Sequence, residues 1–229
     1  YKMFGVNAEL LIDHAWGYEP CTIAEIKSYT PENNSLGSGQ VLKSPYPYEK
    51  AKLIVREMTE LLVLDLVEKR LANQMVLTVG YDIENLKDKE NAYQGEITTD
   101  RYGRKIPKHA HGTANLGLYT TSTQKIIAAV MELFDRIIDP TLFVRRVTLT
   151  ANHVIAESKV QKEQEFEQLD LFSMLQEKEQ NEKEKEQLEK ERKMQEAIIE
   201  LKHKFGKNAI LKGMNLQEGG TTIERNGQI

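Results

Sequence analysis

Two groups of side chains in this 229-residue sequence have the chemistry to bind phosphate. The first is the segment RYGRKIPKHAH at 101–111, which carries four cations and no acid: Arg101, Arg104, Lys105 and Lys108. The second is the pair Arg145 and Arg146, within the alternating segment FVRRVTLTANH at 143–153. Because the chain has a formal net charge of −4, these local positive groups favour contact with nucleic acid. A solvated surface loop is the alternative for the first group.

Catalytic and metal-binding patterns are weak by comparison. We find no nucleotide-binding glycine loop and no nucleophile motif. His109 and His111 have an H-x-H spacing, but no cysteine or carboxylate accompanies them, so we expect no metal there. Asp82 and Glu84 lack a third carboxylate nearby, which favours turn residues. The sequence therefore predicts a binding region with no catalytic residue, metal or cofactor of its own.

Composition limits the location of the protein. Cys21 is the only cysteine, which excludes an intramolecular disulfide and fits a reducing cytoplasm. No apolar run approaches the ~20 residues needed to span a bilayer, and the first residues lack the features of a secretory signal. We therefore expect a cytoplasmic protein without a membrane role. Since the chain begins at Tyr1 within a helical pattern, we also expect a fragment.

Hydrophobic periodicity predicts the elements that position these side chains. Strands are expected at 36–42, 75–82, 111–119 and 143–153, where β-favouring residues alternate or small residues predominate. Helices are expected from Pro47 to about 71 and from Thr121 or Ser122 to just before Pro140, each with one apolar stripe. The order is β-α-β-β-α-β, an α+β fold in which two helices cover one face of a four-stranded antiparallel sheet.

The other face of that sheet is predicted to be open, and strand alternation selects its residues. If Val147 and Leu149 face the helices, Arg146, Thr148 and Thr150 face outward. Arg145 is then at the start of the strand, near the edge of the open face. In the third strand we expect Ala114, Leu116 and Leu118 inside, and Thr113, Asn115 and Gly117 outside. The first strand offers small residues that allow another backbone to approach, namely Ser35, Gly37, Ser38, Gly39 and Gln40. Neither SLGSGQVL in the first strand nor GTANLGL in the third contains an aromatic residue, which argues against base stacking and for backbone contacts.

The flanking segments differ in character from this domain. Residues 1–28 are predicted to form two short helices around FGVNAELLIDHAWGYEP, too small to fold alone. After 29–155, residues 156–175 contain a short apolar island. Residues 176–205 read as a charged helix with pairs at i and i+4, interpreted as a solvated helix rather than a coiled coil. The end, 206–229, is predicted to be largely unstructured or partner-dependent.

These residues carry a resemblance to a known family. FGVNAELLIDHAWGYEP resembles the end of the thumb of Y-family translesion DNA polymerases, the DinB/UmuC-like group. The segments SLGSGQVL, PYEKAKLIVREM, MVLTVGYD, HGTANLGLY and FVRRVTLTANH are similar to the family's little finger, most of all in UmuC-like proteins of Gram-positive bacteria. QLDLF at 168–172 looks like the pentapeptide by which bacterial polymerases dock on the sliding clamp.

The resemblance implies roles in DNA repair and in the SOS response to damage. It implies that the sheet binds the backbone of primer-template DNA, and that the thumb segment contacts the minor-groove side near Gly5–Asn7. The DNA contacts expected from the sequence and the resemblance together are Ser35, Gly37, Ser38, Gln40, Arg101, Arg104, Lys105, Lys108, Thr113, Asn115, Arg145 and Arg146. The expected clamp contacts are Gln168, Leu169, Asp170, Leu171 and Phe172.

The chain lacks the palm that such an enzyme needs, with its carboxylates for two Mg²⁺ ions. We therefore expect this part to bind DNA without extending it, and the parent chain to be the polymerase. The charged helix is not explained by the resemblance, and we assign it to a further repair protein as an open expectation. Two alternatives remain: a stand-alone nucleic-acid-binding adaptor of ferredoxin-like fold, and a scaffold that recruits partners through the charged helix.

Overall fold

The computed structural model describes residues 3–5, 7–19, 21–29, 34–67, 70–87, 93–100, 103–157 and 174–227. In the long C-terminal helix, side chains are described at 183 and from 185 onward. The chain separates into two units, Tyr1–Asn33 and Asn34–Ile229, and each is described by itself.

The first unit contains the two short helices that the sequence predicts, α1 (Asn7–Ala15) and α2 (Ile23–Ser28). Thr22 caps α2 through a capping box with Glu25: the Thr22 hydroxyl accepts from the Glu25 amide, and the Glu25 carboxylate accepts from the Thr22 amide. Ala8 is the one buried residue among those described in this unit, whereas Trp16 is 87% exposed. Local capping therefore supports α2, since the two helices have almost no core of their own.

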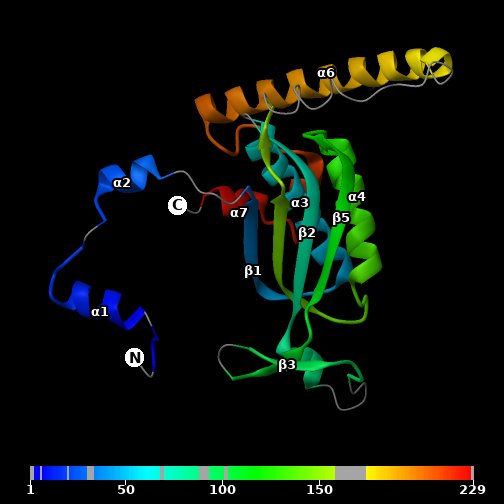
Figure 1. Ribbon diagram of the computed structural model, residues 1–229. Helices are drawn as coiled ribbons and strands as arrows, with labels where there is room; N and C mark the ends of the chain where they lie inside the picture. Colours follow the sequence, from blue (N-terminus) through cyan, green and yellow to red (C-terminus); the bar gives the residue numbers. More distant parts are fainter. Residues whose placement is uncertain are drawn as a thin grey trace. The chain divides into compact units, whose positions relative to one another are not determined.

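The second unit has a mixed α/β architecture and is built on an antiparallel sheet (Figure 1). Its main elements, in chain order, are β1 (Leu36–Tyr46), α3 (Tyr48–Val67), β2 (Arg70–Tyr81), β5 (Ala110–Thr120), α4 (Thr123–Ile137) and β6 (Val144–Asn152). The strands lie side by side in the order β1-β6-β2-β5, and the short strand β7 (Ile155–Ala156) pairs with the start of β2. β6, the last long strand, is therefore central in the sheet.

Helices α3 and α4 bury their apolar stripes against one face of this sheet. The stripe of α3 includes Ile54, Met58 and Leu62, and that of α4 includes Val130 and Phe134, all at most 1% exposed. The strands supply the opposite wall of the core with Met75, Leu77, Val79, Val147 and Leu149, all fully buried. This alternation leaves the other face of each strand without a covering helix.

The connection between β2 and β5 contains secondary structure that is not among the strands and helices predicted from the sequence. It holds the 3₁₀ helix η1 (Ile83–Leu86) and a hairpin of β3 (Ile97–Thr99) and β4 (Lys105–Pro107). Gly103 closes the hairpin turn with a φ of 77°, a conformation that glycine adopts without steric cost. The Asp100 amide donates to the Arg104 carbonyl at 2.9 Å, which extends the ladder into the turn.

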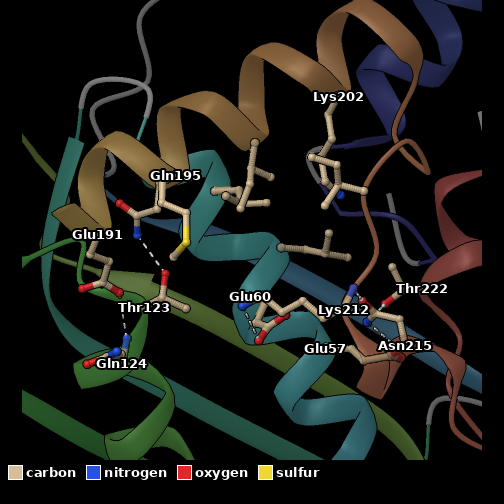
Figure 2. Close-up of a pocket in the computed structure, with 15 residues that line it drawn as sticks. Glu57, Glu60, Thr123, Gln124, Glu191, Gln195, Lys202, Lys212, Asn215 and Thr222 are labelled. Atoms are coloured by element: carbon tan, nitrogen blue, oxygen red, sulfur yellow. Dashed lines mark hydrogen bonds and ion pairs between the residues drawn. The ribbon is translucent and has the colours of Figure 1, made fainter.

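The C-terminal part is ordered, and the expectation of an unstructured end is wrong for the described residues. Helix α6 (Met174–Phe205) is followed by η3 (Gly213–Leu216) and α7 (Thr222–Asn226). This C-terminal segment, residues 206–227, packs on α3, and Figure 2 shows part of the contact. Its polar contacts to α3 are Asn215 Nδ2 to Glu57 Oε1 at 2.9 Å, the Thr221 amide to Glu57 Oε2 at 2.8 Å, Lys212 to Glu60 at 2.8 Å, and Lys50 to Glu218 at 2.6 Å.

Helix α6 also differs from the solvated helix that its charge pattern predicts. Gln195 is only 3% exposed and donates to the Thr121 carbonyl at 2.9 Å and to Thr123 Oγ1 at 2.8 Å. Arg192 is ion-paired with Glu157, next to β7. The helix therefore docks at the N-terminal end of α4. None of the described helices is both long and apolar enough to cross a membrane.

Candidate nucleic-acid interface

The open face of the sheet carries the side chains that point away from α3 and α4. In β6, Val147 and Leu149 are fully buried, whereas Arg146 is exposed and Thr148 and Thr150 are partly exposed. In β5, Thr113 and Asn115 are exposed and Ala114 lies inside. The inward and outward sets in β6 are those that strand alternation predicts.

Strand register arranges these outward residues in rows across the face. One row runs Gly37, Thr150, Val76, Thr113 through β1, β6, β2 and β5. The next row runs Gly39, Thr148, Thr78, His111 in the same order. A third group consists of Asn152, Gln74 and Asn115. Hydroxyls, amides and an imidazole therefore lie beside one another, and none of these residues has a carboxylate.

Hydrogen bonds along the rows hold the polar side chains in place. Asn152 donates to Gln74 at 3.2 Å, and Gln74 donates to Asn115 at 3.0 Å. Thr78 Oγ1 and His111 Nδ1 are 2.8 Å apart. These side chains lose less rotamer freedom on binding a partner, because the fold already restrains them.

At the β1 edge of this face, two glycines leave the neighbouring threonines uncovered by side chains. Gly37 and Gly39 are exposed and lie opposite Thr150 and Thr148. A Cβ at Gly37 would come within 3.3 Å of Thr150 Oγ1, tighter than most real contacts. The hydroxyl of Thr150 is therefore accessible to an approaching backbone because residue 37 has no side chain.

The two arginines of β6 have different surroundings. Arg146 pairs with Gly80 and Val144 pairs with Tyr81, so Arg145 occupies a bulge between them. The bulge directs Arg145 toward the end of the strand, where its Nε lies 3.6 Å from Asp82 Oδ2 and its Nη1 donates to the Lys43 carbonyl at 3.1 Å. Arg146 has no partner among the described ion pairs and hydrogen bonds. It is the cation that the open face presents.

Ser38 and Gln40 do not belong to this face, and their predicted placement on it is wrong. Leu36 packs against the core, so the even-numbered residues at the start of β1 point to the helix side. There Ser38 accepts a hydrogen bond from Arg225, and Gln40 donates to Thr221 Oγ1 at 2.9 Å. Ser35 is exposed just before β1 begins.

The hairpin cations are partly neutralised, which the segment 101–111 alone does not reveal. Arg104 pairs with Asp100 at 2.7 Å and Lys108 with Glu96 at 2.7 Å, both acids lying just upstream of that segment. Lys105 is exposed, and Arg101 lies outside the described residues. The local positive charge is therefore weaker than the sequence segment suggests.

Two residues missed by sequence reasoning contribute to the face, Gln74 and Thr78 of β2. The alternation of MVLTVGYD would have identified Thr78, since buried Leu77 and Val79 place Thr78 outside.

Leu118, expected inside, is 67% exposed because Gly117 adopts a φ of 76° and breaks the alternation of β5. Asp82 caps η1 by accepting from the Glu84 amide at 2.9 Å, a turn role. Among described residues, no group of three potential ligands could hold a metal ion.

The predicted clamp-docking residues lie outside the described part of the chain. They are Gln168, Leu169, Asp170, Leu171 and Phe172. Their contribution to function stays a prediction from the sequence.

Comparisons with known proteins give coarse structural similarity only. No protein-family model matches the chain, and no curated protein matches it. The complex of beta-clamp processivity factor and little finger domain of PolIV aligns at 12% identity with a TM-score of 0.32, over 60% of this chain and 97% of that chain. The post-insertion binary complex of Dbh DNA polymerase aligns at 10% identity with a TM-score of 0.32, over 66% of this chain and 36% of that chain. Function is therefore argued from the open face itself.

Proposed function

We propose that this chain is the DNA-binding and clamp-docking part of a translesion DNA polymerase of the Y family, from the UmuC-like group of Gram-positive bacteria. The observation that carries the DNA-binding half is the open face, whose rows of hydroxyl, amide and imidazole groups, with Arg146, contain no carboxylate. Such donors suit phosphate oxygens, and the absence of acids avoids repulsion from a polyanion.

The mode of binding proposed is backbone tracking without sequence readout. None of the outward residues in the rows is a phenylalanine, tyrosine or tryptophan, and the one aromatic ring, that of His111, is held by Thr78 at 2.8 Å, so the rows offer little surface for base stacking. Arg146 supplies the charge, Thr113, Thr148 and Thr150 supply hydroxyl donors, and the glycines of β1 allow the sugar-phosphate backbone to approach. Lys105 of the hairpin is a second cation for the same duplex. Damaged primer-template DNA is the substrate class proposed.

The other parts of the proposal rest on the sequence resemblance. The apolar residues exposed in the first unit suit a helical pair that more protein covers, as at the end of a polymerase thumb. Catalysis and Mg²⁺ binding are assigned to a palm in the parent chain, acting in DNA repair and the SOS response in the cytoplasm. The exposed charged positions of α6, such as Lys183, Glu186 and Lys190, are where a further repair protein would bind.

The DNA-binding proposal is tested with Arg146→Ala and a matched control, Arg56→Ala, on the exposed side of α3. Losing one phosphate contact should reduce the slope of log affinity against log salt concentration by about 0.9 in magnitude. It should also weaken binding equally across primer-template sequences. Fluorescence anisotropy at several salt concentrations measures both. If Arg146→Ala keeps the wild-type slope, or if Arg56→Ala lowers it as much, the open face is not the binding surface.

The clamp-docking proposal is tested with Leu171→Ala and Phe172→Ala combined. In the resemblance these side chains fill an apolar pocket, so their loss should abolish retention on immobilised bacterial sliding clamp. The control replaces Met174 and Leu175 by alanine, an apolar pair just outside the pentapeptide. If the variant with Leu171→Ala and Phe172→Ala is still retained on the clamp, docking through QLDLF is refuted. DNA binding should be unchanged in this variant and in the control, which makes the outcome independent of the DNA-binding test.

A further inference from the structure

A cavity of about 290 Å³ lies on the helix side of the second unit, between α3, the end of α6 and the C-terminal segment. It is separate from the open face. Apolar side chains of α3 and α6 form one part of its wall, namely Leu61, Leu62, Leu64 and Ile199. Basic side chains form another part, namely Lys202, His203, Lys207 and Arg225. Among the described residues that line it, Asp65 is the one carboxylate.

Two of these cations, Lys202 and Arg225, are held in place by neutral groups. The Lys202 ammonium donates to the Lys207 carbonyl at 3.0 Å. Arg225 donates to the Ser38 hydroxyl, and its Nη1 lies 3.5 Å from Gln40 Oε1. Neither Lys202 nor Arg225 belongs to an ion pair among those described. Figure 2 shows Lys202 reaching from α6 toward α3, at the border with a neighbouring cavity.

The electrostatics of the wall favour an added anion. Burial lowers the pKa of Lys202; Glu60 acts in the opposite direction, and the positive charge of Lys212 lowers the pKa further. Burial also lowers the pKa of Arg225, although Asp65 and Glu57 attract its charge. The carboxylates nearby therefore do not compensate fully for the desolvation of these cations.

We propose that this cavity binds a small phosphorylated molecule, with its phosphate against Lys202, Lys207 and Arg225 and its organic body against Leu61, Leu62 and Leu64. Lys202, Lys207 and Arg225 line the cavity together with a single carboxylate, Asp65, so its wall carries more cations than acids and suits a phosphate monoester of charge about −1.5 to −2. Arginine and lysine together suit the three phosphate oxygens, since the guanidinium offers paired donors and each ammonium a point charge.

Binding here would connect parts of the chain that are distant in sequence. Leu61 belongs to α3, Lys202 to the last turns of α6 and Arg225 to α7. A ligand that contacts all three stabilises the docked C-terminal segment by mass action, because it binds only the docked arrangement.

The test titrates the whole chain with thymidine 5′-monophosphate, inorganic phosphate, succinate and chloride at equal ionic strength. We expect the monophosphate to raise the midpoint of thermal unfolding most and inorganic phosphate to raise it less, whereas succinate and chloride leave it near the starting value. Calorimetric titration gives the dissociation constant, which Arg225→Gln should weaken about tenfold, the effect of one lost phosphate contact.

Two further variants control this result. Lys207→Gln should also weaken binding about tenfold; it removes a charge without breaking any described side-chain contact, so it serves if Arg225→Gln loosens the segment. Lys204→Gln, exposed on α6 over the Phe205 ring, should bind like the wild type. The site is refuted if chloride stabilises as well as the monophosphate, or if Arg225→Gln and Lys207→Gln both bind normally. Equal binding of succinate would overturn the assignment to phosphate.

Discussion

At the residue scale, Glu57 is the buried acid that holds the C-terminal segment. It is 2% exposed in the middle of α3, and its two carboxylate oxygens accept from Asn215 Nδ2 and from the Thr221 amide. Asn215 also donates to Thr222, so a small network of polar groups closes away from water. A buried carboxylate is tolerated only when such donors replace its hydration.

Glu57→Ala should therefore destabilise the protein by about 2 kcal/mol, because the Asn215 amide and the Thr221 N–H would remain buried without their acceptor. Urea unfolding followed by circular dichroism measures the change. Glu132→Ala, at an exposed position in the middle of α4, is the control and should stay within about 0.5 kcal/mol of the wild type. A loss for Glu57→Ala no larger than for Glu132→Ala would show that the network contributes nothing.

Arg145 and Arg146 show how one residue of register changes a side chain's role. The sequence predicts a phosphate contact for both, with Arg146 on the open face and Arg145 near the start of the strand. The bulge at Arg145 turns it toward Asp82 and the Lys43 carbonyl, and leaves Arg146 alone on the open face. Of the two, Arg146 is therefore the stronger candidate for a phosphate contact. Alternation already places Arg146 outward, but it does not predict the contacts of Arg145, because it assumes an unbroken strand.

At the element scale, α6 supplies a cap to another helix. Ser122 is the N-cap of α4 and accepts from the Lys125 amide at 3.3 Å. Glu191 of α6 then accepts from the Ser122 hydroxyl at 2.7 Å and from the Gln124 amide at 3.1 Å. A carboxylate at this position satisfies a free N–H of the first turn and interacts favourably with the helix dipole.

Glu191→Ala should cost about 1 kcal/mol of stability and loosen α6 from α4, because the cap is one of the few polar links between them. Hydrogen exchange should then speed up in residues 191–202 before it does in the sheet. Glu189→Ala, exposed two residues earlier on the same helix, is the matched control. Unchanged exchange in the Glu191 variant would mean that other contacts hold the helix.

At the scale of the whole molecule, the second unit is larger than its sheet and two helices. The C-terminal segment covers Glu57 on α3 and Ser38 and Gln40 on β1, more than 150 residues away in sequence. Lys50, Lys43 and Lys212 add ion pairs around its margin. The segment is therefore an integral layer of this unit rather than a free extension.

Removing residues 206–229 should lower the free energy of unfolding by about 2 to 4 kcal/mol, since Glu57 would lose its donors and the side of α3 that the segment covers would become exposed. Urea unfolding gives the difference, and limited proteolysis gives the change in α6. Removing only residues 228–229 keeps every described contact and should have no effect. Equal stability of the shorter chain would contradict the packed arrangement.

The sequence by itself determined the secondary structure of the core and most of one face. Alternation in β6 and 3-to-4 spacing in α3 and α4 are local patterns, which follow from strand and helix geometry and need no knowledge of partners. Thr113, Asn115 and Arg146 could thus be assigned to the open side in advance. The inward placement of Leu118 failed because a glycine with positive φ interrupts the pattern.

Only the tertiary structure decided the role of the C-terminal part and the fate of Ser38, Gln40 and Arg145. The charge pattern of α6 and the polar end looked solvated, because the buried carboxylate, the cap and the cavity beside α7 each need residues from distant segments. Local periodicity reports which side of an element is apolar. It does not report which polar groups will meet, since that depends on long-range contacts that form only when the chain has folded.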